Sequence, residues 1–233
     1  LEDNAKALGI DLGKAKAIVL SHGHYDHVGG LPGVLQLLPD VPVFCHPEVV
    51  RKRYSRGKNA SVHSVNSTYL TDAFQRERGK SIRWMEGPTS ILGGVFATGE
   101  VPRRNDWEDV GGAFFLDEEC TQPDFIRDDQ SLYFEGANGV VLILGCAHAG
   151  VINTMEHVME ISGNGTIHSV FGGMHLLHAG EERIARTGAA FEAYGVERMG
   201  PCHCTGVGAV SAFRSRFPLQ FEEIYAGKTV RFE

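Results

Sequence analysis

The sequence predicts a mixed α and β fold with hairpins rather than a strict alternation of strands and helices. Short apolar runs rich in β-branched residues alternate with segments of helical character. Asn138-Gly139 stands between two such runs, and this dipeptide is a strong signal for a tight hairpin. Because a tight hairpin joins neighbouring strands directly, we expect an α/β (α+β) fold rather than a series of βαβ units.

Each apolar run bounded by turn residues is expected to form one strand. These runs span residues 17–21, 41–46, 81–86, 94–101, 131–136, 139–146, 166–173 and 198–203. The segments of helical character span residues 2–8, 31–38, 47–54, 153–162, 181–194 and 207–216. Asn153, with Glu156 three residues later, fits a capping box and therefore predicts a helix that starts there.

The chain has the size and composition of one domain spanning residues 1–233. With 233 residues and 42% apolar side chains, it can bury a core without disulfide staples. Residues 55–80 break the pattern, because this stretch is polar and has little periodicity. An insertion of this kind is either a functional lid or a mobile loop.

Composition disfavours several classes of partner. The net charge is −7, and a nucleic-acid partner requires a concentrated basic surface. We interpret the one basic cluster, Arg51-Lys52-Arg53, as a solvated helix face. The five irregularly spaced cysteines do not predict a secreted disulfide framework, and no apolar run approaches the length of a membrane span. We expect a cytoplasmic protein with a small-molecule substrate, and a homo-oligomer is compatible with the sequence.

The segment SHGHYDHVGG, residues 21–30, concentrates candidate metal ligands at the end of a predicted strand. His22 and His24 are two residues apart in an extended stretch, so both can face one side. Asp26 and His27 follow and can reach a second point about 3–4 Å away, the spacing of two-metal sites. Imidazoles with one carboxylate suit zinc first, with manganese or iron as alternatives.

Three more histidines follow predicted strands at the points where the backbone turns. His148, His175 and His203 each follow an apolar run and lie two residues from a glycine or a proline. Strand ends at one edge of a sheet meet at a common site, so we expect these side chains to add ligands. His157 and His178 are expected to be solvated, and His46 is either near the site or a plain loop residue. We assign no role to these or to the remaining histidines.

These residues carry a resemblance to a known family. The HGHYDH motif, with the three later histidines, resembles the HxHxDH signature of the metallo-β-lactamase fold superfamily. GCAHAGVINT (145–154), FGGMHLL (171–177) and PCHCTG (201–206) are similar to one subfamily, which is known as metal-dependent hydrolases or dihydropterin-methyl-ribofuranosyl-aminobenzene-phosphate synthases. The resemblance covers essentially the whole chain and implies an αββα sandwich.

The resemblance also implies a dinuclear site that holds two divalent metal ions. The first ion would take His22, His24 and His148, and the second would take Asp26, His27 and His203. The superfamily usually bridges the two metals with an aspartate before the last histidine, where this chain has Gly-Gly-Met-His. His175 is the natural substitute. We also expect the N-terminal strands of the fold to be missing, because the motif comes unusually early.

The implied activity is that of a metal-dependent hydrolase using a metal-activated hydroxide. Asp26 would ligate metal and orient the hydroxide, which would attack a small phosphorylated or ester substrate. The alternative is a synthase that condenses a pterin with a ribofuranosyl-aminobenzene phosphate at the same site. A non-catalytic binding protein, a di-iron redox protein and a nuclease are weaker alternatives.

Substrate contacts are less specific in the sequence. Glu100 and Arg103 follow a predicted strand, and the arginine can clamp a phosphate or pair with Asp106 or Glu108. The segment Asp128–Gln130 either bends towards the site or caps the hairpin that follows it. If the stretch around His203 stays extended, Cys202 and Cys204 point opposite to the histidine and pack.

Overall fold

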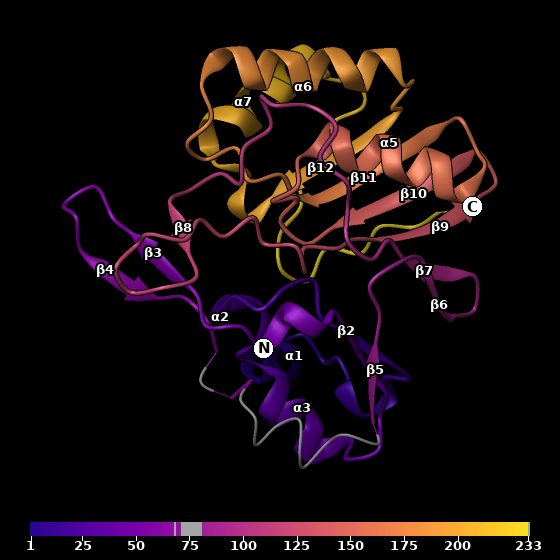
Figure 1. Ribbon diagram of the computed structural model, residues 1–233. Helices are drawn as coiled ribbons and strands as arrows, with labels where there is room; N and C mark the ends of the chain where they lie inside the picture. The colour runs from indigo at the N-terminus through magenta and orange to yellow at the C-terminus, as the bar shows by residue number, and fades with distance from the viewer. Residues whose placement is uncertain (68, 71–80, 233) are drawn as a thin grey trace. The chain divides into compact units, whose positions relative to one another are not determined.

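The computed structural model describes residues 1–67, 69–70 and 81–232. The chain forms two compact units, each with its own sheets and core (Figure 1). The first unit comprises Leu1–Glu86 and Ala113–Asp124, and the second comprises Gly87–Gly112 and Phe125–Glu233. Among the described residues, none of the helices combines the length and the apolar composition that crossing a membrane requires.

The first unit contains a parallel sheet in the order β1-β2-β5. Its strands are β1 (Ile18–Val19), β2 (Val43–Cys45) and β5 (Ile82–Trp84), and each lies within a predicted run. The helical segments that precede β2 are α1 (Glu2–Ala7), η1 (Leu12–Lys14), α2 (Tyr25–Val28) and α3 (Leu31–Leu37). Leu31 and Leu35 of α3 share a buried cluster with Val43 of β2. This burial fixes the helix that follows the first histidine motif.

A second sheet of the first unit shows that the predicted helix over residues 47–54 is wrong. Only Pro47–Val50 is helical, as the 3₁₀ turn η2, and the chain then enters β3 (Tyr54–Arg56). Strand β3 pairs antiparallel with β4 (Val62–Ser64) and with β8 (Phe114–Phe115). The local sequence around residues 47–54 carries no sign of the distant partner β8. Pairing with that strand therefore outweighs the helical periodicity of the segment. The predicted insertion thus contains a hairpin, and its residues 68 and 71–80 lie outside the described residues.

Arg53 also contradicts the prediction of a solvated basic helix face. Its side chain is fully buried, and its Nε donates to Oδ2 of Asp124 at 2.7 Å. Both residues belong to the first unit. The guanidinium therefore joins two segments that are far apart in the sequence.

The second unit is built on a six-stranded sheet in the order β12-β11-β10-β9-β7-β6. Its strands are β6 (Thr89–Leu92), β7 (Val95–Ala97), β9 (Leu132–Gly136), β10 (Gly139–Leu144), β11 (Ile167–Gly173) and β12 (Arg198–Cys202). Strands β10, β11 and β12 are parallel, whereas β6, β7, β9 and β10 pair antiparallel in succession. The mixed sheet and the hairpin turn at Asn138-Gly139 confirm the predicted α/β class.

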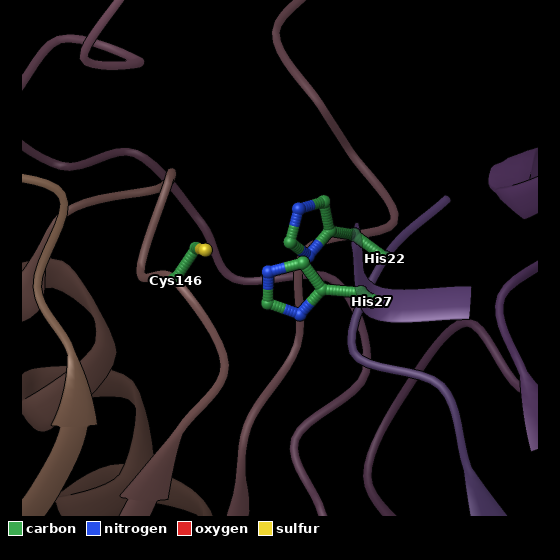
Figure 2. A group of neighbouring side chains, drawn as sticks. All are labelled: His22, His27 and Cys146. Carbon is green, nitrogen blue, oxygen red and sulfur yellow. The ribbon is translucent and has the colours of Figure 1, made fainter. Parts of the chain in front are cut away.

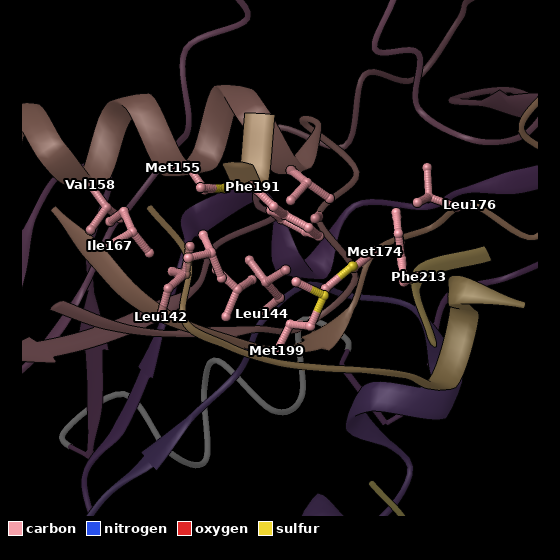
Figure 3. Packing of buried hydrophobic residues seen from close by; sticks show 14 of the residues in the cluster. Leu142, Leu144, Met155, Val158, Ile167, Met174, Leu176, Phe191, Met199 and Phe213 are labelled. Carbon is pink, nitrogen blue, oxygen red and sulfur yellow. The ribbon is translucent and has the colours of Figure 1, made fainter. Parts of the chain in front are cut away.

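Helices α5 (Val151–Ser162), α6 (Glu181–Ala193) and α7 (Val207–Arg216) lie along one side of this sheet (Figure 1). Leu142 and Leu144 of β10 pack with Met155 of α5, Phe191 of α6 and Phe213 of α7 (Figure 3). Each fully buried side chain of this size stabilises the fold by about 1.5–3 kcal/mol. The cluster holds the C-terminal ends of the parallel strands in place.

Helix α5 begins two residues before the predicted start, and its cap differs from the predicted capping box. Its N-cap is Gly150, which has no capping side chain. Glu108, from a distant loop of the same unit, accepts hydrogen bonds from the main-chain N–H groups of Ile152 and Asn153 at 2.9 Å each. The buried carboxylate replaces a local cap, which sequence spacing could not reveal.

Candidate metal-binding residues

The first unit places His22 and His24 side by side directly after β1. Nε2 of His22 lies 3.1 Å from Nδ1 of His24, and both side chains are buried. Two ligands of one tetrahedral zinc at 2.0–2.1 Å are separated by about 3.3 Å, so the two nitrogens fit a shared ion. A Cβ on the intervening Gly23 would overlap the main-chain oxygen of Val49. Glycine is therefore required for this bend to pack closely.

Asp26 and His27 stand on the short helix α2 that follows. Nε2 of His27 lies 3.6 Å from Oδ2 of Asp26, and the His27 ring centroid lies 4.1 Å from that of His22 (Figure 2). Ser21 Oγ lies within hydrogen-bond distance of Nδ1 of both His22 and His27, at 3.2 Å and 3.0 Å. One hydroxyl thus orients two rings with their Nε2 atoms directed away from it, which is the support that metal-ligating histidines require.

The second unit carries its candidate ligands at one edge of its sheet. His148 follows β10, His175 follows β11 and His203 follows β12, and these three strands are parallel. His175 and His203 have φ of 46° and 53°, and Ala147 beside His148 has φ of 56°. Left-handed backbone at non-glycine residues costs energy and concentrates at functional sites. The common edge confirms the reasoning that predicted these positions, although their role as ligands remains a prediction.

His148 and His175 lie together within this unit. Their ring centroids are 4.0 Å apart, and potential ligand atoms of Cys146, His148 and His175 lie within 4.8 Å of one another. Nδ1 of His148 lies 2.8 Å from the main-chain oxygen of Val110. Because a carbonyl only accepts hydrogen bonds, Nδ1 carries the proton, and Nε2 is left with the lone pair that a metal needs.

His203 lies in a second group with two thiols. Potential ligand atoms of Cys146, His203 and Cys204 lie within 4.8 Å of one another. The stretch does not stay extended, because the 3₁₀ turn η3 (His203–Thr205) begins at the histidine, so the condition under which Cys204 would point away from His203 is not met. A hydrogen bond to Cys146, with His175 and His203 nearby, lowers the pKa of Cys204 to about 4. Figure 2 shows Cys146 on the loop after β10.

Arg103 is held by main-chain carbonyl groups. Its Nη2 donates to the oxygens of His148 at 2.6 Å and Phe125 at 3.0 Å, and its Nη1 donates to the oxygen of Glu108 at 3.2 Å. Burial lowers the pKa of Arg103 from its usual value. Glu100 instead pairs with Arg127, whose Nε lies 2.7 Å from Oε1. Arg103 therefore supports the His148 loop, a role that the sequence did not predict.

A pocket of about 330 Å³ lies within the second unit beside these residues. It is lined by Glu100, Val101, Pro102, Arg103, Phe125, Ile126, Arg127, Asp129 and Ala149. Asp129 is 2% exposed, and its Oδ2 accepts a hydrogen bond from the N–H of Ala149 at 3.2 Å. Burial raises the pKa of Asp129 to about 7. Of the two alternatives for this segment, Asp129 therefore contacts the loop that carries His148.

The sequence predicted the histidines of the candidate site, but it did not predict the cysteines that lie beside them. The first unit brings His22, His24, Asp26 and His27 together, and the second brings His148 together with His175 and gives His203 two cysteine neighbours. Cys146 and Cys204 were detectable only as cysteines next to ligand histidines in GCAH and CHC. His157, expected to be solvated, is 7% exposed, and burial lowers its pKa. It lies on α5 near the main-chain oxygen of Thr98, so it is a packed histidine.

The donor chemistry of both units suits a divalent metal. Neutral imidazoles, one carboxylate and nearby thiols match borderline ions such as zinc, and the 3.1 Å spacing of His22 and His24 fits a shared ion.

Comparisons with known proteins point in one direction. A model of the metallo-beta-lactamase superfamily matches residues 1–186. A 7,8-dihydropterin-6-methyl-4-(beta-D-ribofuranosyl)-aminobenzene-5'-phosphate synthase of Methanocaldococcus jannaschii is 29% identical over 98% of the chain and 79% of its own length. An uncharacterized protein of the same organism is 30% identical over 83% of the chain and 70% of its own length.

Two solved structures resemble the chain over nearly its whole length. Tm1679, described as a metal-dependent hydrolase of the beta-lactamase superfamily, aligns with a TM-score of 0.78 and 31% identity, covering 99% of the chain and 84% of its own. A diphosphatase of the PhnP family aligns with a TM-score of 0.53 and 13% identity, covering 100% of the chain and 76% of its own. The second likeness concerns the fold alone.

Proposed function

Because the chain belongs to the metallo-beta-lactamase superfamily, as its histidine motif predicted, we propose that it is a dinuclear metal-dependent hydrolase. Its substrate is a small molecule that carries a phosphate or ester group. The chain is a homologue of metal-dependent hydrolases, so the general class rests on family membership. The dinuclear site and the substrate class are the parts proposed here.

The observation that carries the proposal is the pair of histidines after β1. Nε2 of His22 and Nδ1 of His24 face each other at 3.1 Å, with the support of Ser21 for the His22 ring. The two nitrogens lie at hydrogen-bond distance, and the same spacing suits two adjacent ligands of one divalent ion.

The proposed ligands are the six residues implied by the family resemblance, together with His175 as the substitute for the usual aspartate. They are His22, His24, Asp26, His27, His148, His175 and His203. Divalent ions, when bound, supply Lewis acidity and lower the pKa of water to about 7. Asp26, half exposed beside His27, is the carboxylate that orients the attacking water and accepts its hydrogen bond. The His148 imidazole is held in one tautomer by Val110.

The experiment measures metal content and metal-dependent cleavage together. Purified protein is assayed by elemental analysis and with bis(p-nitrophenyl) phosphate and p-nitrophenyl acetate, before and after chelation. We expect bound metal, activity that chelation abolishes and loss of both in His24→Ala. His63→Ala is the matched control, because His63 is an exposed histidine of the same unit. Substoichiometric metal together with no metal-dependent cleavage would contradict the proposal.

A synthase is the second candidate, favoured by the similarity to the Methanocaldococcus jannaschii enzyme over 98% of the chain. The same residues would then serve a condensation in which the amine of a ribofuranosyl-aminobenzene phosphate displaces a leaving group, such as diphosphate, from the 6-methyl carbon of an activated dihydropterin and loses a proton. Incubation with both compounds, followed by separation of products, distinguishes the two candidates. A joined product without cleavage of generic esters would favour the synthase, and the reverse would favour the hydrolase.

A further inference from the structure

Two thiols and one imidazole meet at the edge of the six-stranded sheet where its parallel strands end. Cys146 follows β10, and His203 and Cys204 follow β12 in the turn η3. Potential ligand atoms of these three residues lie within 4.8 Å of one another. All three belong to the second unit, so the fold of this unit alone brings them together.

A glycine on the strand between them gives one thiol its space. Strand β11 lies between β10 and β12, and Gly173 is its last residue. A Cβ on Gly173 would lie 2.7 Å from Sγ of Cys204 and 2.5 Å from the main-chain oxygen of Gly145. Because glycine carries no side chain, Sγ of Cys204 can lie 3.7 Å from the main-chain oxygen of Cys146. The glycine therefore lets the two thiols approach each other.

The backbone at His203 directs two neighbouring side chains into the same group. Residues adjacent in an extended strand point to opposite faces, so they do not normally share an ion. Here φ of His203 is 53°, in the left-handed region, and the strand ends before this residue. Such a conformation at a non-glycine residue costs free energy and concentrates at functional sites. It allows the imidazole of His203 and the thiol of Cys204 to reach one point.

The donor set selects soft cations. Two thiolates that each lie about 2.3 Å from one tetrahedral ion are about 3.8 Å apart, so a group within 4.8 Å needs little adjustment to bind it. Thiolate ligands favour thiophilic ions over hard ones such as magnesium. Cys146 is 2% exposed, whereas His203 is exposed and Cys204 is partly exposed. An ion can therefore enter past His203 and reach a sulfur atom that is shielded from water.

We propose that Cys146, His203 and Cys204 bind one thiophilic cation, of the class of cadmium(II) and copper(I). The two thiols lose their protons to solvent as the metal–sulfur bonds form, and His203 contributes a neutral nitrogen. A neutral imidazole has one lone pair for a metal, and His203 is also a proposed ligand of the dinuclear site. A thiophilic ion bound here therefore removes His203 from that site and inhibits the hydrolase. The inhibition rests on the proposed function, whereas the binding of the ion does not.

The test uses cadmium(II), because its bonds to thiolates give an ultraviolet charge-transfer band that its bonds to imidazole or carboxylate lack. Reduced protein, freed of metal by chelation and dialysis, is titrated with cadmium chloride under nitrogen. We expect a band that saturates. The cadmium concentration at half-saturation should rise at least about tenfold in Cys204→Ser, because loss of a ligand costs more than loss of an outer support.

The matched control is Cys202→Ser, since Cys202 also neighbours His203 but does not belong to the group. Its half-saturation should equal that of the wild-type protein. Absence of the band in the wild-type protein would overturn the proposal without any variant. An unchanged half-saturation in folded Cys204→Ser would overturn it as well. An equal rise in Cys202→Ser would also do so, because it would assign the ion to another pair of thiols.

A second measurement separates this inference from the proposed function. Cadmium is added to metal-loaded protein during cleavage of bis(p-nitrophenyl) phosphate. We expect cleavage to fall over the concentration range in which the band grows without substrate, and unchanged cleavage at a saturated band would overturn the inhibition. A thiolate band in protein that shows no metal-dependent cleavage would leave the cadmium site standing and contradict the hydrolase. Metal-dependent cleavage without the band would do the opposite.

Discussion

The guanidinium of Arg103 holds the main-chain oxygen of His148, with Nη2 and the oxygen 2.6 Å apart. The contact lies within the second unit and joins two segments that are 45 residues apart in the sequence. It holds the main chain of the His148 loop in place.

Replacing Arg103 with lysine should weaken metal binding through His148. Lysine keeps the charge but cannot reach three carbonyl oxygens with a planar fork. Loss of an outer support of a ligand typically costs about 10- to 100-fold in metal affinity. Zinc affinity is measured by competition with a chromogenic chelator, with Arg186→Lys on the surface of α6 as control. Equal affinities in the two variants would contradict the supporting role.

Replacing Gly111 with alanine should displace His175. Gly111 has φ of +80°, and a Cβ there would overlap the His175 ring. If His175 is a ligand, Gly111→Ala lowers both the thermal midpoint and the metal bound per chain, as measured by elemental analysis. Gly165→Ala, where a Cβ meets nothing within 4 Å, is the control. A lower midpoint with unchanged metal content would exclude His175 from the ligands.

Replacing Glu108 with alanine should destabilise helix α5. The carboxylate accepts hydrogen bonds from the Ile152 and Asn153 N–H groups, and its charge favours a helix N-terminus. We expect a loss of about 1–3 kcal/mol in the free energy of unfolding, measured with urea. Glu135→Ala, at an exposed strand position, should cost much less. Similar losses in the two variants would show that the cap contributes little.

Breaking the buried ion pair of the first unit should lower the free energy of unfolding strongly, and added salt should not reduce this loss. Arg53 and Asp124 have side-chain exposures of 0% and 2%. Removing one charge leaves the other buried, so Asp124→Asn should cost about 3–5 kcal/mol. Glu223→Gln, from the exposed pair with Arg214, should cost less than about 1 kcal/mol. Urea unfolding at low and high salt measures both, and a small or salt-sensitive loss in Asp124→Asn would contradict the burial argument.

The pKa of Asp129 should produce a pH-dependent stability in chelated protein. Burial raises this pKa from 3.8 to about 7, so the folded state binds more protons than the unfolded state between these values. The contribution is present below 3.8 and is lost as pH rises through about 7. Asp129→Asn should remove this fall, so the variant gains stability relative to wild type as pH rises. Unfolding curves across this range test the difference, and parallel profiles would refute it.

Much of the fold could be predicted because its signals are local. Strands β1, β2, β5, β7 and β9 to β12 each lie within a predicted run, since burial of a strand leaves apolar residues adjacent in the sequence. The wrong helix over residues 47–54 has the opposite cause. Strand β3 forms by pairing with β8, and no local period encodes a partner about sixty residues away.

In the candidate site, too, some features could be predicted from the sequence and others depend on the tertiary structure. By itself the sequence determined the histidine motif, the strand-end positions of the later histidines and the family, because these depend on residue type and short spacing. Only the tertiary structure decided that Arg103 holds the His148 loop, that Cys204 joins His203, that Glu108 caps α5 and that Asp129 is buried in a pocket. These roles depend on contacts between residues distant along the chain, and only the folded backbone brings such residues within hydrogen-bond distance.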